Sequence, residues 1–131
     1  MVSKSFQKEG GFTLLELMVV VAVIAVLAAI AFMQYQKFTV RAFDTAAKSD
    51  LRNSMIALEA YFSYQNVYPA TSTELQANGL KQLSQNVSFK KYEVEAMTGG
   101  GQTVHMHVKH SGSPNTWHAN YPEEGSTIEI R

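Results

Sequence analysis

A single acidic residue is the most unusual chemical feature of this 131-residue chain. Between Phe12 and Met33 every residue is apolar except Thr13 and Glu16. An ionised carboxylate within such an apolar run is costly unless a cation lies close to it. Glu16 therefore predicts a charged partner.

Histidines are the other side chains whose spacing could do chemistry, here the binding of zinc or copper. Valine and methionine alternate with polar residues between Val104 and Lys109, which predicts a strand with His105 and His107 on one face. Two further histidines follow at His110 and His118. Because the chain has no cysteine and no cluster of aspartates beside them, we expect solvent-facing histidines, no bound metal and no cofactor.

The N-terminal segment has the pattern of a processed membrane precursor. Lys4 and Lys8 precede a small-residue junction, and the run from Phe12 to Met33 follows. As a helix this run is about 33 Å long, which is enough to cross a bilayer. The two lysines predict that the leader stays in the cytoplasm and that the C-terminal region lies across the inner membrane.

The junction Gly11-Phe12-Thr13-Leu14-Leu15-Glu16 resembles the prepilin signature of the type IV pilin and type II secretion pseudopilin family. The resemblance implies cleavage between Gly11 and Phe12, N-methylation of Phe12, and a role for Glu16 in assembly. It also implies the partners: a prepilin peptidase, an assembly ATPase, an inner-membrane platform protein and further copies of the chain in a helical filament. The protein would then move from the inner membrane to a filament at the cell surface.

After Met33 the pattern becomes amphipathic. One stripe of the expected helix is apolar, and it consists of Phe43, Ala47, Leu51, Leu58 and Phe62. A neighbouring face carries candidate subunit contacts at Arg41, Asp44, Lys48 and Arg52, with Asp44 spaced to pair with Lys48. Pro69 forces Tyr68 out of helical geometry, so we expect the helix to end near Asn66.

The rest of the chain predicts a small head. Thr71 to Glu74 has the pattern of a capping box, which predicts a short helix over residues 73–78. Four segments read as strands separated by glycine- and proline-containing turns; they are residues 88–97, 103–110, 116–121 and 127–131. The expected fold class is α+β: a long helix packed on a small antiparallel sheet. The expected organisation is a removed leader (1–11), a transmembrane or filament-core helix (12–33), the amphipathic half of that helix (34–68) and the head (69–131).

The helix is also rich in aromatic residues. From Phe12 to Pro69 it is similar to the helix of short aromatic-rich pilins associated with extracellular electron transfer. The residues that would pack together or carry electrons are Phe12, Phe32, Tyr35, Phe38, Phe43, Phe62 and Tyr68. We favour packing, because aromatic rings conduct only when they are closely stacked.

Several features depart from common members of the family. Where many members carry glycine and proline inside the first helix, this chain has Ala25 and Met33, so we expect the helix to be continuous there. A C-terminal disulfide is excluded by the absence of cysteine. The one adjacent acidic pair, Glu123 and Glu124, is too small to form a calcium loop.

These observations favour a non-enzymatic structural subunit, a pilin of a type IV pilus that serves adhesion, motility or electron transfer. One alternative is a major pseudopilin of a type II secretion system. An alternative of another class is a monomeric, membrane-anchored periplasmic sensor or binding domain. With 11 basic and 11 acidic residues, the chain shows no basic field that would indicate nucleic-acid binding.

Overall fold

The computed structural model describes residues 10–98, 100–122 and 129–130. The chain divides into two units, residues 1–37 and residues 38–131, which are considered separately. Helix α1 (Leu14–Gln65) contributes to both. It runs without a break through Ala25 and Met33, as the absence of glycine and proline predicts.

Helix α1 ends where the sequence predicts an end. Asn66 has a φ of 57°, and its amide donates to the carbonyl of Phe62 at 2.8 Å. An asparagine in left-handed geometry is a common way to close a helix. Pro69, which is fully buried, follows before the chain turns into α2.

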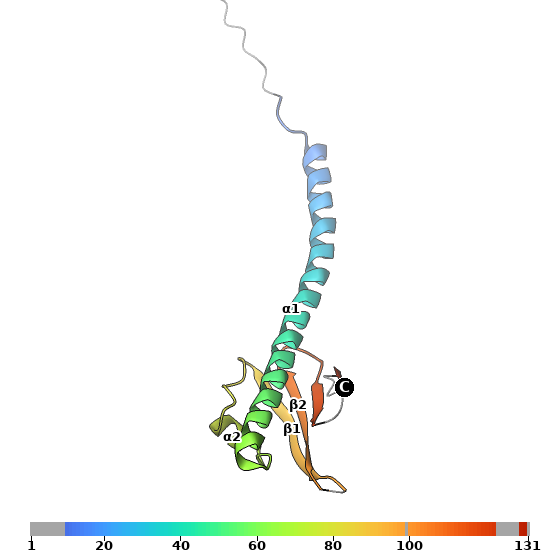
Figure 1. The fold of residues 1–131 in the computed structure, drawn as a ribbon. Helices are drawn as coiled ribbons and strands as arrows, with labels where there is room; N and C mark the ends of the chain where they lie inside the picture. Colours follow the sequence, from blue (N-terminus) through green and yellow to red (C-terminus); the bar gives the residue numbers. More distant parts are fainter. Residues whose placement is uncertain (1–9, 99, 123–128, 131) are drawn as a thin grey trace, which may run out of the picture. The chain divides into compact units, whose positions relative to one another are not determined.

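A four-stranded antiparallel sheet forms the head, with its strands in the order of the sequence (Figure 1). The strands are β1 (Val87–Ala96), β2 (Gln102–His110), β3 (Trp117–Tyr121) and β4 (Glu129–Ile130). The first three strands lie within one residue of their predicted bounds. Most of the fourth predicted strand lies outside the described residues. A register shift between Phe89 and Lys91 interrupts the pairing of β1 with β2.

The core lies between this sheet and the second half of α1. Val104, Met106 and Val108 of β2 are all fully buried, as the alternation in the sequence predicts. Trp117 and Ala119 extend the same face into β3. The predicted stripe of α1 covers it: Ala47, Leu51 and Leu58 are fully buried, and Phe43 and Phe62 are partly buried. Burial of each leucine side chain contributes about 2 kcal/mol to folding.

The short helix α2 (Ser72–Ala77) begins as the sequence predicts, but not with the expected capping box. The Thr71 hydroxyl accepts a hydrogen bond from the Glu74 amide at 3.2 Å. The Glu74 carboxylate does not return to the Thr71 amide. Instead it accepts from the amide of Ala70 at 2.9 Å and from the hydroxyl of Tyr61 in α1 at 2.6 Å. Glu74 therefore caps α2 and also ties it to α1.

Candidate functional site

The junction before α1 is exposed. Among the described residues, no atom beyond the chain neighbours lies within 4 Å of the position that a Cβ would occupy at Gly10 or Gly11, and both glycines are exposed. Phe12 is 89% exposed. An enzyme can therefore reach the peptide bond between Gly11 and Phe12, which lies outside the helix.

Thr13 and Glu16 form a reciprocal capping box at the start of α1. The Thr13 hydroxyl accepts from the Glu16 amide at 3.2 Å. One carboxylate oxygen of Glu16 accepts from both the Thr13 amide, at 2.9 Å, and the Thr13 hydroxyl, at 2.8 Å. This arrangement satisfies backbone groups that a helix leaves without partners at its first turn. It explains why the helix begins at Leu14 and not at Phe12.

The capping box also fixes the position of the Glu16 carboxylate. The group is held at the N-terminal end of the helix, where the helix dipole favours negative charge. It lies four residues from the amine that cleavage at Gly11 would create. A carboxylate in this position is available to a cation that approaches the first turn.

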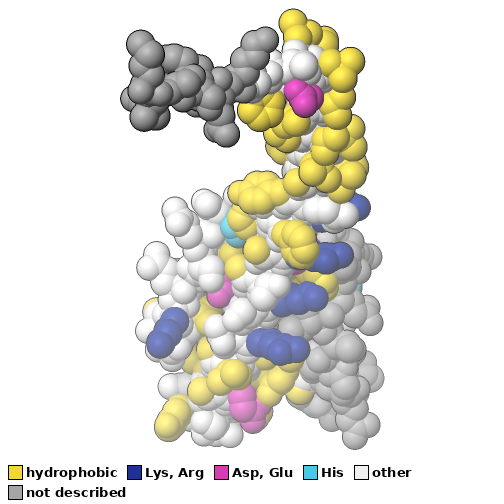
Figure 2. Space-filling view, turned by 90° about the horizontal axis from the view of Figure 1, so that it is seen from above, with side chains coloured by type: hydrophobic (Ala, Val, Ile, Leu, Met, Phe, Trp, Pro, Cys, Tyr) yellow, Lys and Arg dark blue, Asp and Glu magenta, His cyan; other side chains and the backbone are white. Residues whose placement is uncertain are grey.

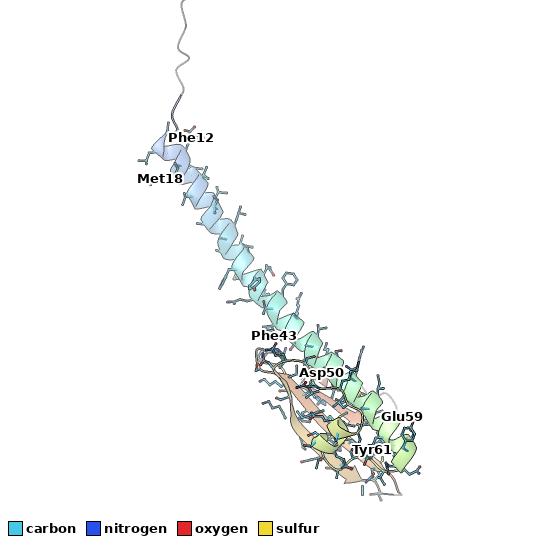
Figure 3. The ribbon with its side chains drawn as sticks, turned by 90° about the vertical axis from the view of Figure 1, so that its left-hand side faces the viewer. Phe12, Met18, Phe43, Asp50, Glu59 and Tyr61 are labelled. Atoms are coloured by element: carbon cyan, nitrogen blue, oxygen red, sulfur yellow. The ribbon has the colours of Figure 1, made fainter. Side chains whose placement is uncertain are left out.

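The apolar side chains that follow have no cover in the first unit. Leu14 is 76% exposed, Leu15 72% and Met18 66%, and Figure 3 shows Phe12 and Met18 standing outward near the start of the helix. Hydrophobic side chains gather over this end of α1 in Figure 2. By length and composition, α1 includes a stretch able to cross a membrane. A continuous apolar surface of this size requires lipid or other protein surfaces around it.

Among the four candidate subunit contacts, Asp44 is bonded within the head. Its carboxylate accepts from Ser113 Oγ at 2.5 Å, Asn115 Nδ2 at 2.7 Å and Trp117 Nε1 at 3.3 Å. Partial burial disfavours its charge, but these three hydrogen bonds and the nearby Lys48 outweigh that effect and lower the pKa of Asp44. Asp44 thus joins α1 to the segment between β2 and β3.

The three basic candidates are exposed on the same helix. Arg41 lies 5.8 Å from the ring centre of Phe38, and Lys48 Nζ lies 3.8 Å from that of Trp117. Lys48 thus acts on Asp44 through its charge while its ammonium group contacts the indole face. This differs from the direct ion pair that the spacing of four residues predicts. Arg41, Lys48 and Arg52 remain candidates for contact with another molecule.

Two further carboxylates of α1 hold the head together and lie outside the set of candidate site residues that the sequence predicts. Asp50 is buried and accepts from the Ser84 amide at 2.7 Å and from Ser84 Oγ at 3.1 Å. Glu59 accepts from the hydroxyl of Tyr121. Figure 3 shows Asp50 and Glu59 on successive parts of α1 beside the head. The interruption of the apolar stripe by Asp50 is the one sequence signal for this role.

The aromatic residues divide between the two units. In the head, Phe43 stacks on His110 at 4.0 Å between ring centres, and Phe62 stacks on Tyr68 at 4.7 Å. Tyr68 also meets Tyr121 edge to face at 6.1 Å. Phe12, Phe32, Tyr35 and Phe38 are exposed. The structure thus brings Phe43, Phe62 and Tyr68 into packing contacts.

The histidines lie on both faces of the sheet. His105 and His107 share the outer face of β2, and His118 of β3 is the register partner of His107. His110 lies on the buried face, where its Nδ1 accepts from the Gly112 amide at 3.0 Å. The expectation of a solvent-facing side chain is therefore wrong for His110. Among the described residues, no three histidine, aspartate or glutamate side chains are grouped to hold a metal ion.

An accessible junction, a capped apolar helix and a small α+β head define a class of membrane-anchored precursors. Residues 6–32 match the model of the prokaryotic N-terminal methylation motif. The match covers the N-terminal segment, and its motif is the one that marks prepilins of the type IV pilin and pseudopilin family. No curated protein matches the chain. Proteins of this family are structural subunits and not enzymes.

Proposed function

We propose that this protein is the subunit of a type IV pilus: a peptidase cleaves it between Gly11 and Phe12, and it polymerises through its apolar helix into a filament at the cell surface. The observation that carries the proposal is the apolar first part of α1, which is exposed around Glu16, a carboxylate held at the helix start. Membrane lipid covers this surface before assembly. Neighbouring helices cover it in the filament.

Glu16 has a specific role in this proposal. Cleavage gives Phe12 a charged amine, and the Glu16 carboxylate of one subunit attracts the amine of the next as it docks. In a low-dielectric surrounding, pairing removes much of the cost of two buried charges and fixes the axial register of the subunits. The hydroxyl and amide of Thr13 hold the carboxylate until that cation arrives.

The first experiment tests processing. Mass spectrometry of the protein recovered from the cell surface should show a chain that begins at Phe12 and carries one methyl group on its amine. A mature chain that retains Lys8 would contradict the proposed cleavage.

The second experiment tests assembly. Glu16→Ala should leave the chain synthesised, inserted and cleaved, yet few filaments should be seen by electron microscopy. Glu16→Gln keeps the shape of the side chain and removes its charge. If Glu16→Gln and Glu16→Ala lose filaments equally, the charge of Glu16 is what assembly requires. Glu93→Gln is the matched control, because Glu93 lies in the sheet and forms an exposed ion pair with Lys91 at 2.7 Å. Normal filament numbers in Glu16→Ala cells would contradict the docking role.

A strain that lacks this protein distinguishes a pilus subunit from the pseudopilin alternative. Loss of surface filaments with normal protein secretion supports the pilus. Loss of secretion, in cells that never show surface filaments of this protein, supports the type II secretion pseudopilin.

A further inference from the structure

The outer face of the sheet brings two imidazoles together across neighbouring strands. His107 of β2 and His118 of β3 are direct register partners. Their ring centres lie 5.7 Å apart, with the ring planes inclined by 48°. Directly opposed residues of an antiparallel pair have Cβ atoms about 5 Å apart, so the backbone itself holds these two side chains together.

This separation suits a metal ion between the rings. Zinc binds an imidazole nitrogen at about 2.0–2.1 Å. Two such nitrogens in tetrahedral positions are then roughly 3.3 Å apart. The observed separation of 5.7 Å between the ring centres is compatible with one ion held between the two rings. Both side chains are only partly buried, so an ion can reach them from solvent.

The charges around the pair permit a cation. Lys91, the register partner of His107 in β1, is paired with Glu93. The ammonium group of Lys109 donates to the carbonyl of Pro114 at 3.2 Å. On the other side, Glu129 of β4 is the register partner of His118. The row across the sheet thus holds two imidazoles beside a lysine that is paired with Glu93.

The third histidine of this face, His105, contacts Asn120 and Glu95. His105 Nδ1 lies 2.7 Å from Asn120 Oδ1, and its Nε2 lies 3.4 Å from a carboxylate oxygen of Glu95. Its ring is thus held by two polar neighbours of its own. His105 provides a matched control, since it has the same residue type, strand and face.

We propose that His107 and His118 form a binding site for a divalent transition metal ion, with zinc as the probe. The remaining coordination positions take water or carboxylate oxygen. The site is independent of the apolar helix and of the filament proposal.

The test is isothermal titration calorimetry of the full chain in detergent micelles with ZnCl₂ at pH 7.5. One zinc ion per chain should bind. Loss of even an outer-shell partner lowers metal affinity by about 10- to 100-fold. His107→Gln and His118→Gln should therefore each weaken binding about tenfold or more, whereas His105→Gln should change it less than about twofold.

Two results would overturn the site: no saturable zinc binding by the wild-type chain, or an equal loss in His105→Gln. Thermal unfolding followed by circular dichroism checks that each variant is folded. If the two variants are unfolded, modification of the wild-type chain with diethyl pyrocarbonate decides the question. Zinc should protect His107 and His118 but not His105, and equal modification with and without zinc contradicts the site.

Discussion

Asp44 and Trp117 are joined by a hydrogen bond in which the indole nitrogen donates to the carboxylate at 3.3 Å, and Lys48, one turn along from Asp44, lies over the same indole ring. Trp117 is the chain's single tryptophan and is buried. Its fluorescence therefore reports on the contact between α1 and the sheet. The same contact contains a carboxylate whose ionisation favours folding.

Acid should weaken this contact through Asp44. Because the pKa of Asp44 is lower in the folded chain than its ordinary value of 3.8, the unfolded chain binds the proton first as the pH falls. The stabilisation is fully present above about pH 4 and is lost as the pH falls through the folded-state pKa. Asp44→Asn should cost about 1 kcal/mol at pH 7. The difference in the free energy of unfolding between Asp44→Asn and the wild type should become smaller below pH 4.

Urea unfolding followed by Trp117 fluorescence, at several pH values between 7 and 2, measures this difference. Glu93→Gln serves as the control for a carboxylate outside the contact. If the free energy of unfolding of Asp44→Asn stays below that of the wild type by a constant amount down to pH 2, the shape of the side chain and not its charge accounts for the loss.

Asp50 should hold the segment before β1. Asp50→Ala leaves the amide of Ser84 without its buried acceptor and should cost about 2–3 kcal/mol, whereas Ser84→Ala removes one hydrogen bond and should cost about 1 kcal/mol. Hydrogen exchange measured by mass spectrometry should show faster exchange in residues 80–87, with β2 unchanged. Asn53→Ala, at an exposed position on the same helix, should have no such effect. Equal exchange in Asp50→Ala and wild type would contradict this role.

Gly112 should tolerate no side chain while Phe43 is present. A Cβ at Gly112 would lie 2.5 Å and 2.8 Å from two ring atoms of Phe43, and that ring is itself stacked on His110. Gly112→Ala should therefore cost about 1–3 kcal/mol. In a Phe43→Ala background the same change should cost less than about 0.5 kcal/mol, since the space is then open. Thermal unfolding of the wild type, the two single variants and the double variant gives the coupling energy between the two positions. If the losses of stability are strictly additive, the loop around Gly112 moves away from the Phe43 ring and the proposed clash is wrong.

Thr13 should determine where α1 begins. Thr13→Val keeps the shape and removes the hydroxyl that bonds Glu16, so it should destabilise the first turn by about 1 kcal/mol, whereas Thr13→Ser should retain the cap. Carbon chemical shifts of residues 13–17 in micelles measure the helicity of that turn. If the first turn is equally helical in Thr13→Val and Thr13→Ser, the apolar run alone determines where the helix begins.

The periodicity of the sequence predicts most of the fold, because local spacing determines it. The apolar stripe of α1 and the alternation in β2 each predict the buried face that the structure shows. The capping box at Thr13 was equally visible, since Thr13 and Glu16 have the same spacing as Thr71 and Glu74. An interpretation of the apolar run as one element that begins at Phe12 overlooks this cap.

The contacts between α1 and the loops could not be predicted in this way. Asp50 and Ser84 are 34 residues apart, and Asp44 and Trp117 are 73 residues apart. Such pairs depend on how the helix lies on the sheet, which local patterns do not encode. The facing of His107 and His118 likewise depends on the register between β2 and β3.

The hydrogen bonds of the acidic residues leave an uneven distribution of exposed charge on α1. Asp44, Asp50 and Glu59 are the acidic residues of α1 beyond Glu16, and all three are occupied by donors of the head. Arg41, Lys48 and Arg52 remain exposed on that helix, and Figure 2 shows basic side chains in a row along one face. A chain with a formal net charge of zero therefore presents a positive stripe to its surroundings. Ionic strength will set how closely two such stripes can approach.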